Sequence, residues 1–228
     1  NITFDSTYKL IDYTYESKAN LNEFKLKFSK PIKIDIINDS INNLILKNTK
    51  LDIRYSSDKK NYVSAEGSYG YNNFDFQSFN FKNNFIDEIS NIVVNFNFSE
   101  KISIDLINYK KKVDKVAKIY SKFKIDKNFI NLEKLDYKEN KNLITVDGLK
   151  FKKNNVTSIK KIKIKTYNND NLNNDFSVIF NKKINIIGKK YDATYLSKIL
   201  QKKNDENILK KISKNVEIDL EDITTPLK

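Results

Sequence analysis

Strict alternation of apolar and polar residues dominates this chain. In residues 24–28, every second residue is apolar and the residues between are lysines, and residues 92–98 follow the same alternation except at Val93. Successive side chains of a strand point to opposite faces, so each stretch predicts a short strand with one apolar face. One-sided sheets of this kind are usually antiparallel. The stretches with this pattern are 24–28, 32–36, 51–55, 92–98, 102–106, 162–164, 176–180, 184–186 and 216–220.

Residues 72–81 interrupt the regular alternation. Their four phenylalanines form two pairs of opposite parity, so an unbroken strand would send the pairs to opposite faces. Asn72-Asn73 predicts a hairpin turn, because asparagine tolerates positive φ. A bulge near Gln77 or Ser78 would return all four rings to one face and bend the strand. We therefore predict a bulge there. The four residues are Phe74, Phe76, Phe79 and Phe81.

Two segments show helical spacing instead. Apolar residues recur at helical intervals in residues 109–123, with lysines on the other face. Asp192 can cap a second helix over about residues 193–213. Asp147-Gly148, between two apolar runs, predicts another hairpin turn.

These patterns predict a mainly β fold: an elongated, twisted and curved antiparallel sheet, shaped like a groove or taco, with one or two short amphipathic helices. The 228 residues are interpreted as a single β-rich segment of a larger protein, residues 1–228. A possible sub-division is an N-terminal sheet (1–108), a helix (109–124), and C-terminal strands with a helix (125–228).

The net charge of the chain is strongly positive, and nearly all of its basic residues are lysines. The formal net charge is +13, from 42 Lys+Arg against 29 Asp+Glu, and Arg54 is the only arginine. The abundance of Lys, Asn, Ile, Tyr and Phe is typical of an AT-rich genome, which favours lysine as the default surface residue. Base recognition normally uses the bidentate arginine side chain, so no nucleic-acid partner is expected.

The residue types exclude several kinds of chemistry. The chain has no histidine and no cysteine, so it lacks the usual general base, the thiol nucleophile and the commonest metal ligands. Paired carboxylates, such as Asp87 with Glu88 or Glu221 with Asp222, are interpreted as solvated surface acids. We expect a protein that is not an enzyme, with no cofactor and no metal site.

The stretch "INIIGKKYDATYLSKIL" (residues 184–200) combines an alternating strand, Gly188, two lysines, an aromatic-Asp-small triplet and an amphipathic segment, and "VEIDLEDI" then restarts the strand pattern. This order resembles the AsmA-like superfamily, in particular the central region of YhdP-type proteins, and more distantly TamB. The resemblance is clearest over residues 125–220. It implies a periplasmic protein whose apolar groove carries phospholipid, held to the inner membrane by an anchor outside this chain.

We therefore expect a non-enzymatic segment that shields or guides phospholipid acyl chains across the periplasm and supports outer-membrane homeostasis. The alternatives are a structural β-module, such as a sandwich or adhesin, with a closed core, and, further from the pattern, a nucleic-acid-binding module or a transmembrane barrel. The phospholipid carrier and the structural β-module differ in one observable feature: the apolar faces form an open groove in the first and a closed core in the second. The residues expected to line the groove are Phe74, Phe76, Phe79, Phe81, Val94, Phe96 and Phe98.

Overall fold

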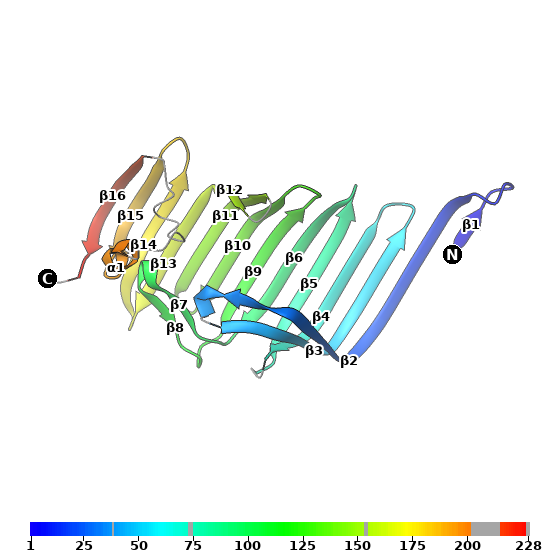
Figure 1. Cartoon of the computed structure of the whole chain (residues 1–228), viewed down its shortest axis with the longest axis horizontal. Helices are drawn as coiled ribbons and strands as arrows, with labels where there is room; N and C mark the ends of the chain where they lie inside the picture. Colours follow the sequence, from blue (N-terminus) through cyan, green and yellow to red (C-terminus); the bar gives the residue numbers. More distant parts are fainter. Residues whose placement is uncertain (38, 73–74, 153–154, 202–214, 227–228) are drawn as a thin grey trace.

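The computed structural model describes residues 1–37, 39–72, 75–152, 155–201 and 215–226. Most of the strands form one 14-stranded twisted sheet, which runs the length of the molecule (Figure 1). Its strands are β1 (Ile2–Phe4), β2 (Leu10–Ile34), β3 (Asp39–Ser56), β4 (Asn61–Tyr71), β5 (Gln77–Ile86), β6 (Ile89–Phe98), β9 (Ala117–Ile125), β10 (Ile130–Glu139), β11 (Asn142–Lys152), β12 (Asn155–Ser158), β13 (Lys161–Asn168), β14 (Asn171–Phe180), β15 (Ile184–Asp192) and β16 (Val216–Thr224).

The strands lie side by side almost in chain order. The order is β1-β2-β3-β4-β5-β6-β9-β10-β11-β13-β14-β15-β16, and β12 pairs only with β11. Neighbouring strands are antiparallel except for β15 and β16, which are parallel. Because β6 pairs directly with β9, the sheet continues without a break across the sub-division considered from sequence. The prediction of a mainly β, antiparallel fold is confirmed.

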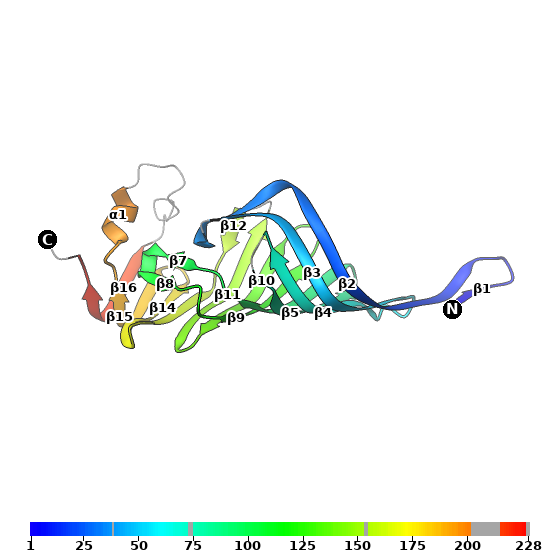
Figure 2. The same cartoon turned by 90° about the horizontal axis from the view of Figure 1, so that it is seen from below.

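The sheet is curved, and the β2–β3 hairpin bends most. Figure 2 shows the far half of this hairpin arching out of the sheet and back over it. The tip carries a short 3-10 helix, η1 (Asp35–Ile37). We call the side of the sheet beneath this arch the concave face, and the opposite side the convex face.

A second, two-stranded sheet covers one end of the concave face. It consists of β7 (Ile102–Ile104), a 3-10 helix η2 (Asp105–Ile107), and β8 (Tyr109–Lys111). We call residues 102–111 the cap hairpin. The η1 turn contacts β7, so the arch and the cap hairpin meet over the same end of the sheet (Figure 2).

The predicted amphipathic helices are not borne out. Residues 109–123 form β8, a turn and most of β9, because residues 118–124 alternate between lysine or tyrosine on one face and Ile, Ser or Phe on the other. In the second stretch, the described part is one six-residue helix, α1 (Leu196–Gln201), and residues 202–214 lie outside the described residues.

The predicted bulge at Gln77–Ser78 is also wrong. The register between β4 and β5 is unbroken from Tyr69 opposite Gln77 to Asn61 opposite Phe85. The bend arises in β3 instead, where the register to β4 shifts between Lys47 and Lys50.

Two small features of the backbone permit this bend. Asn48 takes a φ of 47°, in the left-handed region that asparagine tolerates. Opposite it stands Gly67, where a Cβ atom would lie 2.6 Å from the Thr49 hydroxyl oxygen and 2.8 Å from the Thr49 Cα. A residue without a side chain at position 67 therefore lets β3 kink against β4.

Candidate functional site

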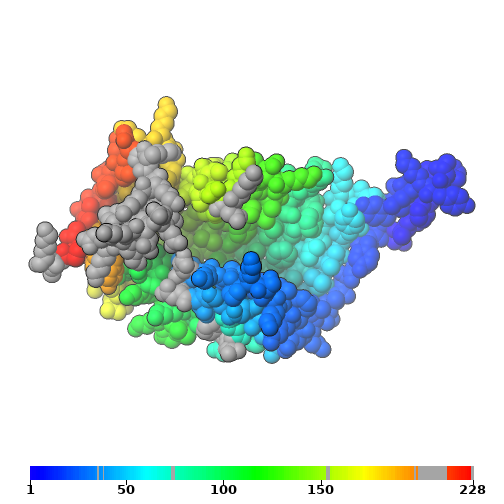
Figure 3. Space-filling view, in the orientation of Figure 1, coloured from blue at the N-terminus to red at the C-terminus, as the bar shows by residue number. Residues whose placement is uncertain are grey.

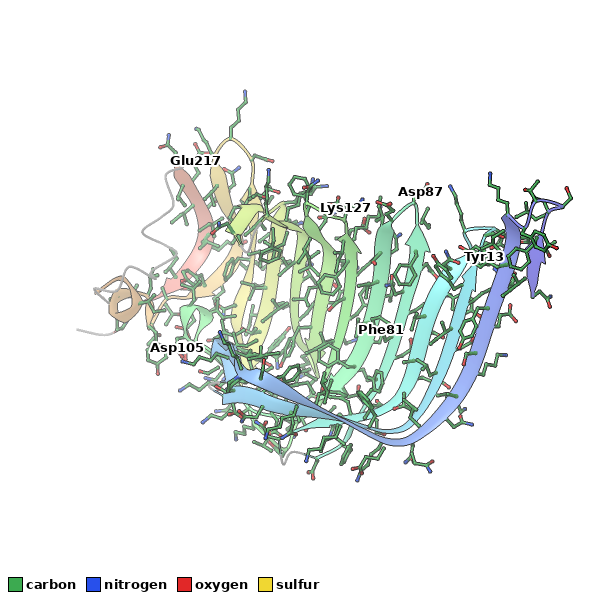
Figure 4. All side chains as sticks on the ribbon, turned by 45° about the vertical axis from the view of Figure 1, so that its right-hand side comes forward. Tyr13, Phe81, Asp87, Asp105, Lys127 and Glu217 are labelled. Carbon is green, nitrogen blue, oxygen red and sulfur yellow. The ribbon has the colours of Figure 1, made fainter. Side chains whose placement is uncertain are left out.

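Strand register places a row of apolar side chains on the concave face. Residues directly opposite each other on neighbouring strands point to the same side. Phe79 is opposite Phe96, and Phe81 is opposite Val94. Tyr69 joins them, with its ring edge-on to Phe79 at 6.2 Å and to Phe96 at 5.9 Å. Figure 4 shows Phe81 in the middle of the sheet.

The same row continues across the strands that follow β6. Phe96 of β6 is opposite Ile119 of β9, which is opposite Tyr137 of β10. Tyr137 in turn is opposite Ile144 of β11, and Ile144 is opposite Ile164 of β13. Away from the cap hairpin, most of these side chains are only half-buried, and Figure 3 shows a hollow whose floor is formed by the central strands. We call this half-buried row the apolar trough. Its members are Phe79, Phe81, Ile92, Val94, Phe96, Ile119, Phe123, Leu135, Ile144, Val146, Ile162, Val178 and Ile186.

Beneath the cap hairpin the concave face becomes a closed core. Ile102, Ile107 and Tyr109 of the cap hairpin are each 3% exposed. They pack against a cluster from the main sheet: Tyr71, Phe98, Ala117, Tyr137, Ile164 and Phe176. The concave face therefore has two parts, a closed core at one end and the open trough beyond it.

Polar side chains of the main sheet form hydrogen bonds with the turn of the cap hairpin. Asn174, which is fully buried, donates from Nδ2 to the carbonyl of Ile107 and to the Thr166 hydroxyl, both at 2.7 Å. Its Oδ1 accepts the backbone N–H of Asp192 at 2.9 Å. Asn108 in turn donates to the Asp192 carboxylate at 2.8 Å. Buried polar groups that are all satisfied in this way specify one position for the turn.

The strand β8 is held by a second network. The Tyr109 and Tyr137 hydroxyls are 2.6 Å apart, and Tyr109 also donates to the buried Glu139 carboxylate at 3.2 Å. Burial raises the pKa of Tyr109, and burial likewise raises the pKa of Tyr137 to about 12. Both hydroxyls therefore stay protonated near neutral pH and act as donors.

Lys111, at the end of the cap hairpin, carries a buried ammonium group. Its Nζ donates to the carbonyls of Ser99, Glu100 and Lys112, at 2.5, 2.7 and 3.0 Å. These three bonds use all three N–H donors of the ammonium. Burial lowers the pKa of Lys111. Its bonds to Ser99 and Glu100 hold the end of β8 against the segment that connects β6 to β7.

The structure separates the residues that the sequence grouped as a groove. Phe79, Phe81, Val94 and Phe96 lie together in the trough. Phe98 is in the closed core, stacked on Tyr71 at 6.4 Å. The other two do not join them. Phe76 precedes β5 and lies under the Lys47 ammonium, 4.5 Å from its ring centroid, on the convex side, and Phe74 lies outside the described residues.

Sequence reasoning missed the β9–β11 members of the trough. Ile119 and Phe123 alternate with lysines in "AKIYSKFKI", a pattern that predicts a strand as directly as it allows a helix. The helical reading of residues 109–123 concealed this signal. The alternation of Ile162 and Ile164 predicts a strand, but the register that connects these residues with Phe96 depends on pairings between strands that the pattern does not specify.

The convex face is polar and neutralises much of its own charge. Glu133 accepts ion pairs from Lys122 and Lys124, both at 2.9 Å, and these bonds lower its pKa. Lys165 pairs with Asp175 at 3.2 Å. Lysines are thus matched with acids across neighbouring strands, as expected for a solvated outer face.

Three hollows can be outlined among the described residues, and one of them, of about 270 Å³, is lined by Phe96 and Ile119 together with polar residues such as Asn95 and Lys118. A second, of about 580 Å³, lies beside β8 and is lined by Lys101, Asn108, Tyr167 and their neighbours. Another of about 410 Å³ lies on the polar side of β2–β4, near Lys50 and Glu66.

Within the described parts of the chain, no group of three or more acidic residues is placed to hold a metal ion. The helix that the structure describes is too short to cross a membrane. No protein-family model, characterised protein or solved structure matches the chain.

Proposed function

We propose that the chain is a non-enzymatic carrier segment whose apolar trough shields the acyl chains of a phospholipid. The observation that carries this proposal is the difference between the two parts of the concave face. Phe98 is 8% exposed beneath the cap hairpin, whereas Phe96, two residues earlier in the same strand, packs against this core but is only half-buried.

Physical chemistry favours an apolar cover for such a row. Full burial of one large apolar side chain is worth roughly 1.5–3 kcal/mol, so a continuous row left half in water is costly. Contiguous apolar surface on a protein usually marks an interaction site. A trough that crosses many strands matches an extended apolar ligand better than a compact one.

The resemblance of residues 125–220 to the AsmA-like superfamily supports phospholipid as the ligand and the periplasm as the setting. The charge arrangement of the convex face supports the absence of a nucleic-acid partner, because Lys122, Lys124 and Lys165 are engaged with Glu133 and Asp175.

Photo-crosslinking of the purified chain tests the proposal. A benzophenone amino acid is placed at Phe96, and the chain is mixed with vesicles of phosphatidylethanolamine and phosphatidylglycerol that contain a labelled phospholipid. We expect labelled lipid at position 96 and none at Asn95, which is exposed on the convex side of the same strand. Lys163, also exposed on the convex side, is a second control.

Phe96→Asp separates the trough from a closed core. In an open trough, this change leaves the domain folded and abolishes lipid capture at the neighbouring position Phe81. In a closed core it would bury an unpaired charge and unfold the domain. A folded protein that captures no lipid at any trough position would contradict the proposal and leave the structural β-module.

A further inference from the structure

The main sheet has two outer edges with unpaired backbone. β1 pairs with β2 only as far as Tyr13, and in the described parts of the chain no strand pairs with the outer edge of β2 from Tyr15 onward. The outer edge of β16 likewise has no strand partner among the described residues. Rows of free N–H and C=O groups of this kind accept an additional strand.

The two edges carry opposite charge. The second half of β2 is basic, and none of its lysines forms an ion pair with a described residue. These lysines are Lys25, Lys27, Lys30 and Lys33. β16 has no basic residue, and its four acids are Glu217, Asp219, Glu221 and Asp222. Within the chain, Glu217 pairs with Lys183 and Asp222 pairs with Lys190, at the side of β16 that faces β15.

Apolar side chains also match across the two edges. Phe24 and Leu26 lie on the concave side of β2, because they are in register with Leu46 and Leu44. Ile218 lies on the concave side of β16, opposite Ile186. Leu26 is 42% exposed and Ile218 is 59% exposed, so both would lose contact with water on edge-to-edge pairing.

Topology limits how two copies with their troughs on the same side can meet. Following the antiparallel pairs from β2 to β15 and then the parallel pair β15–β16, the strands β2 and β16 run in the same direction. A pairing of β2 with β2, or of β16 with β16, would be antiparallel and would bring like charges together. A pairing of β16 with β2 is parallel and brings opposite charges together, which favours it.

We propose that β16 of one copy of this chain adds to β2 of a second copy as a parallel strand. A register that sets Glu217 beside Lys25 also sets Ile218 beside Leu26 and Asp219 beside Lys27. The contact is heterologous, so it leaves one free edge of each kind and generates head-to-tail chains of copies. This inference does not depend on lipid binding.

Charge reversal on each edge tests the proposal. We expect the mass of the chain in sedimentation velocity to rise with concentration above the 26.8 kDa monomer at low salt, and to fall toward it at about 1 M salt. Glu217→Lys with Asp219→Lys puts lysines beside Lys25 and Lys27, and Lys25→Glu with Lys27→Glu puts acids beside Glu217 and Asp219. Each double variant alone should be monomeric.

Mixing the two double variants is the decisive step, because each then meets an edge of opposite charge. We expect the mixture to associate again, which also shows that both variants are folded. Lys163→Glu, a reversal on the exposed convex side of β13, should associate like the unmodified chain.

A cysteine at position 27 and another at position 219 add a direct readout, since the chain has no cysteine of its own. Oxidation should join copies into a series of multiples of the monomer on a non-reducing gel. A chain that stays monomeric at every concentration in low salt would overturn the proposal. So would association that neither double variant reduces, or a mixture of the variants that stays monomeric.

Discussion

The hydroxyl oxygens of Tyr109 and Tyr137 lie 2.6 Å apart, and this contact joins the cap hairpin to β10 of the main sheet. The Tyr109 hydroxyl also donates a hydrogen bond to the Glu139 carboxylate, at 3.2 Å. A hydroxyl has one proton to donate. When Tyr109 gives its proton to the carboxylate, Tyr137 is the donor to Tyr109.

This order of donors predicts unequal effects of two similar substitutions. Tyr109→Phe removes both hydrogen bonds and takes a donor from the buried Glu139, so it should lower the free energy of unfolding by about 2–3 kcal/mol. Tyr137→Phe removes only the terminal donor and should cost about 1 kcal/mol. Urea unfolding followed by circular dichroism measures both, and equal losses would contradict the order.

The same pair predicts a loss of stability in alkaline solution. The pKa of Tyr137 is raised from 10.0 to about 12, and that of Tyr109 is raised as well. The fold therefore holds these protons more tightly than the unfolded chain. The stability from Tyr137 is fully present below about pH 10 and is lost as pH rises through about 12.

Urea unfolding at intervals between pH 9 and pH 12 measures this dependence. Tyr137→Phe removes one titrating group, so the variant should lose stability less steeply over this range than the unmodified chain. A variant with an unchanged slope would show that Tyr137 does not titrate differently in the two states.

The bend of the sheet predicts that Gly67 does not tolerate a side chain. In Gly67→Ala, the new Cβ would lie 2.8 Å from the Thr49 Cα, so backbone has to move. We expect a loss of about 1–3 kcal/mol in the free energy of unfolding, as for overpacking elsewhere. Ser68→Ala, the next residue on the opposite face of β4, is the matched control and should change stability by less than about 0.5 kcal/mol.

Local alternation predicted much of this fold because it depends only on neighbouring residues. Residues 92–98, 176–180 and 216–220 lie in β6, β14 and β16 as expected. Phe79, Phe81, Val94 and Phe96 lie side by side because the strands that carry them, β5 and β6, are adjacent in the chain and pair as a hairpin. The existence of strands and the pairing of sequence neighbours are therefore within reach of pattern analysis.

The failures arose where a pattern fits two structures or where long-range contacts decide. The spacing of Tyr109, Val116 and Phe123 fits a helix, but the buried contacts of Tyr109 with β10 require a strand. Asp147-Gly148 resembles a hairpin turn, yet it lies inside β11, where Gly148 takes a φ of 65°. The cap hairpin could not be predicted, because its position depends on Asn174 and Glu139, far away in sequence.

Two phenylalanines of β6 distinguish the closed core from the open trough. Phe98 is 8% exposed, stacks on Tyr71 and lies 5.8 Å from the Lys111 ammonium, measured to its ring centroid. Phe96 points to the same side and packs against this core, but it is only half-buried. Phe98→Ala should therefore leave a cavity and cost about 3–5 kcal/mol. Phe96→Ala should cost roughly half of that or less, because part of its ring already contacts water.

Urea unfolding of the two variants, with the unmodified chain as reference, measures this difference. The slope of the free energy against urea should be the same for all three proteins, so that the midpoints report stability alone. If Phe96→Ala cost as much as Phe98→Ala, the ring of Phe96 would be part of a closed core, and the trough would have no surface to offer an acyl chain. A small loss at position 96, together with retained folding of Phe96→Asp, is the result expected of a trough open to an apolar ligand.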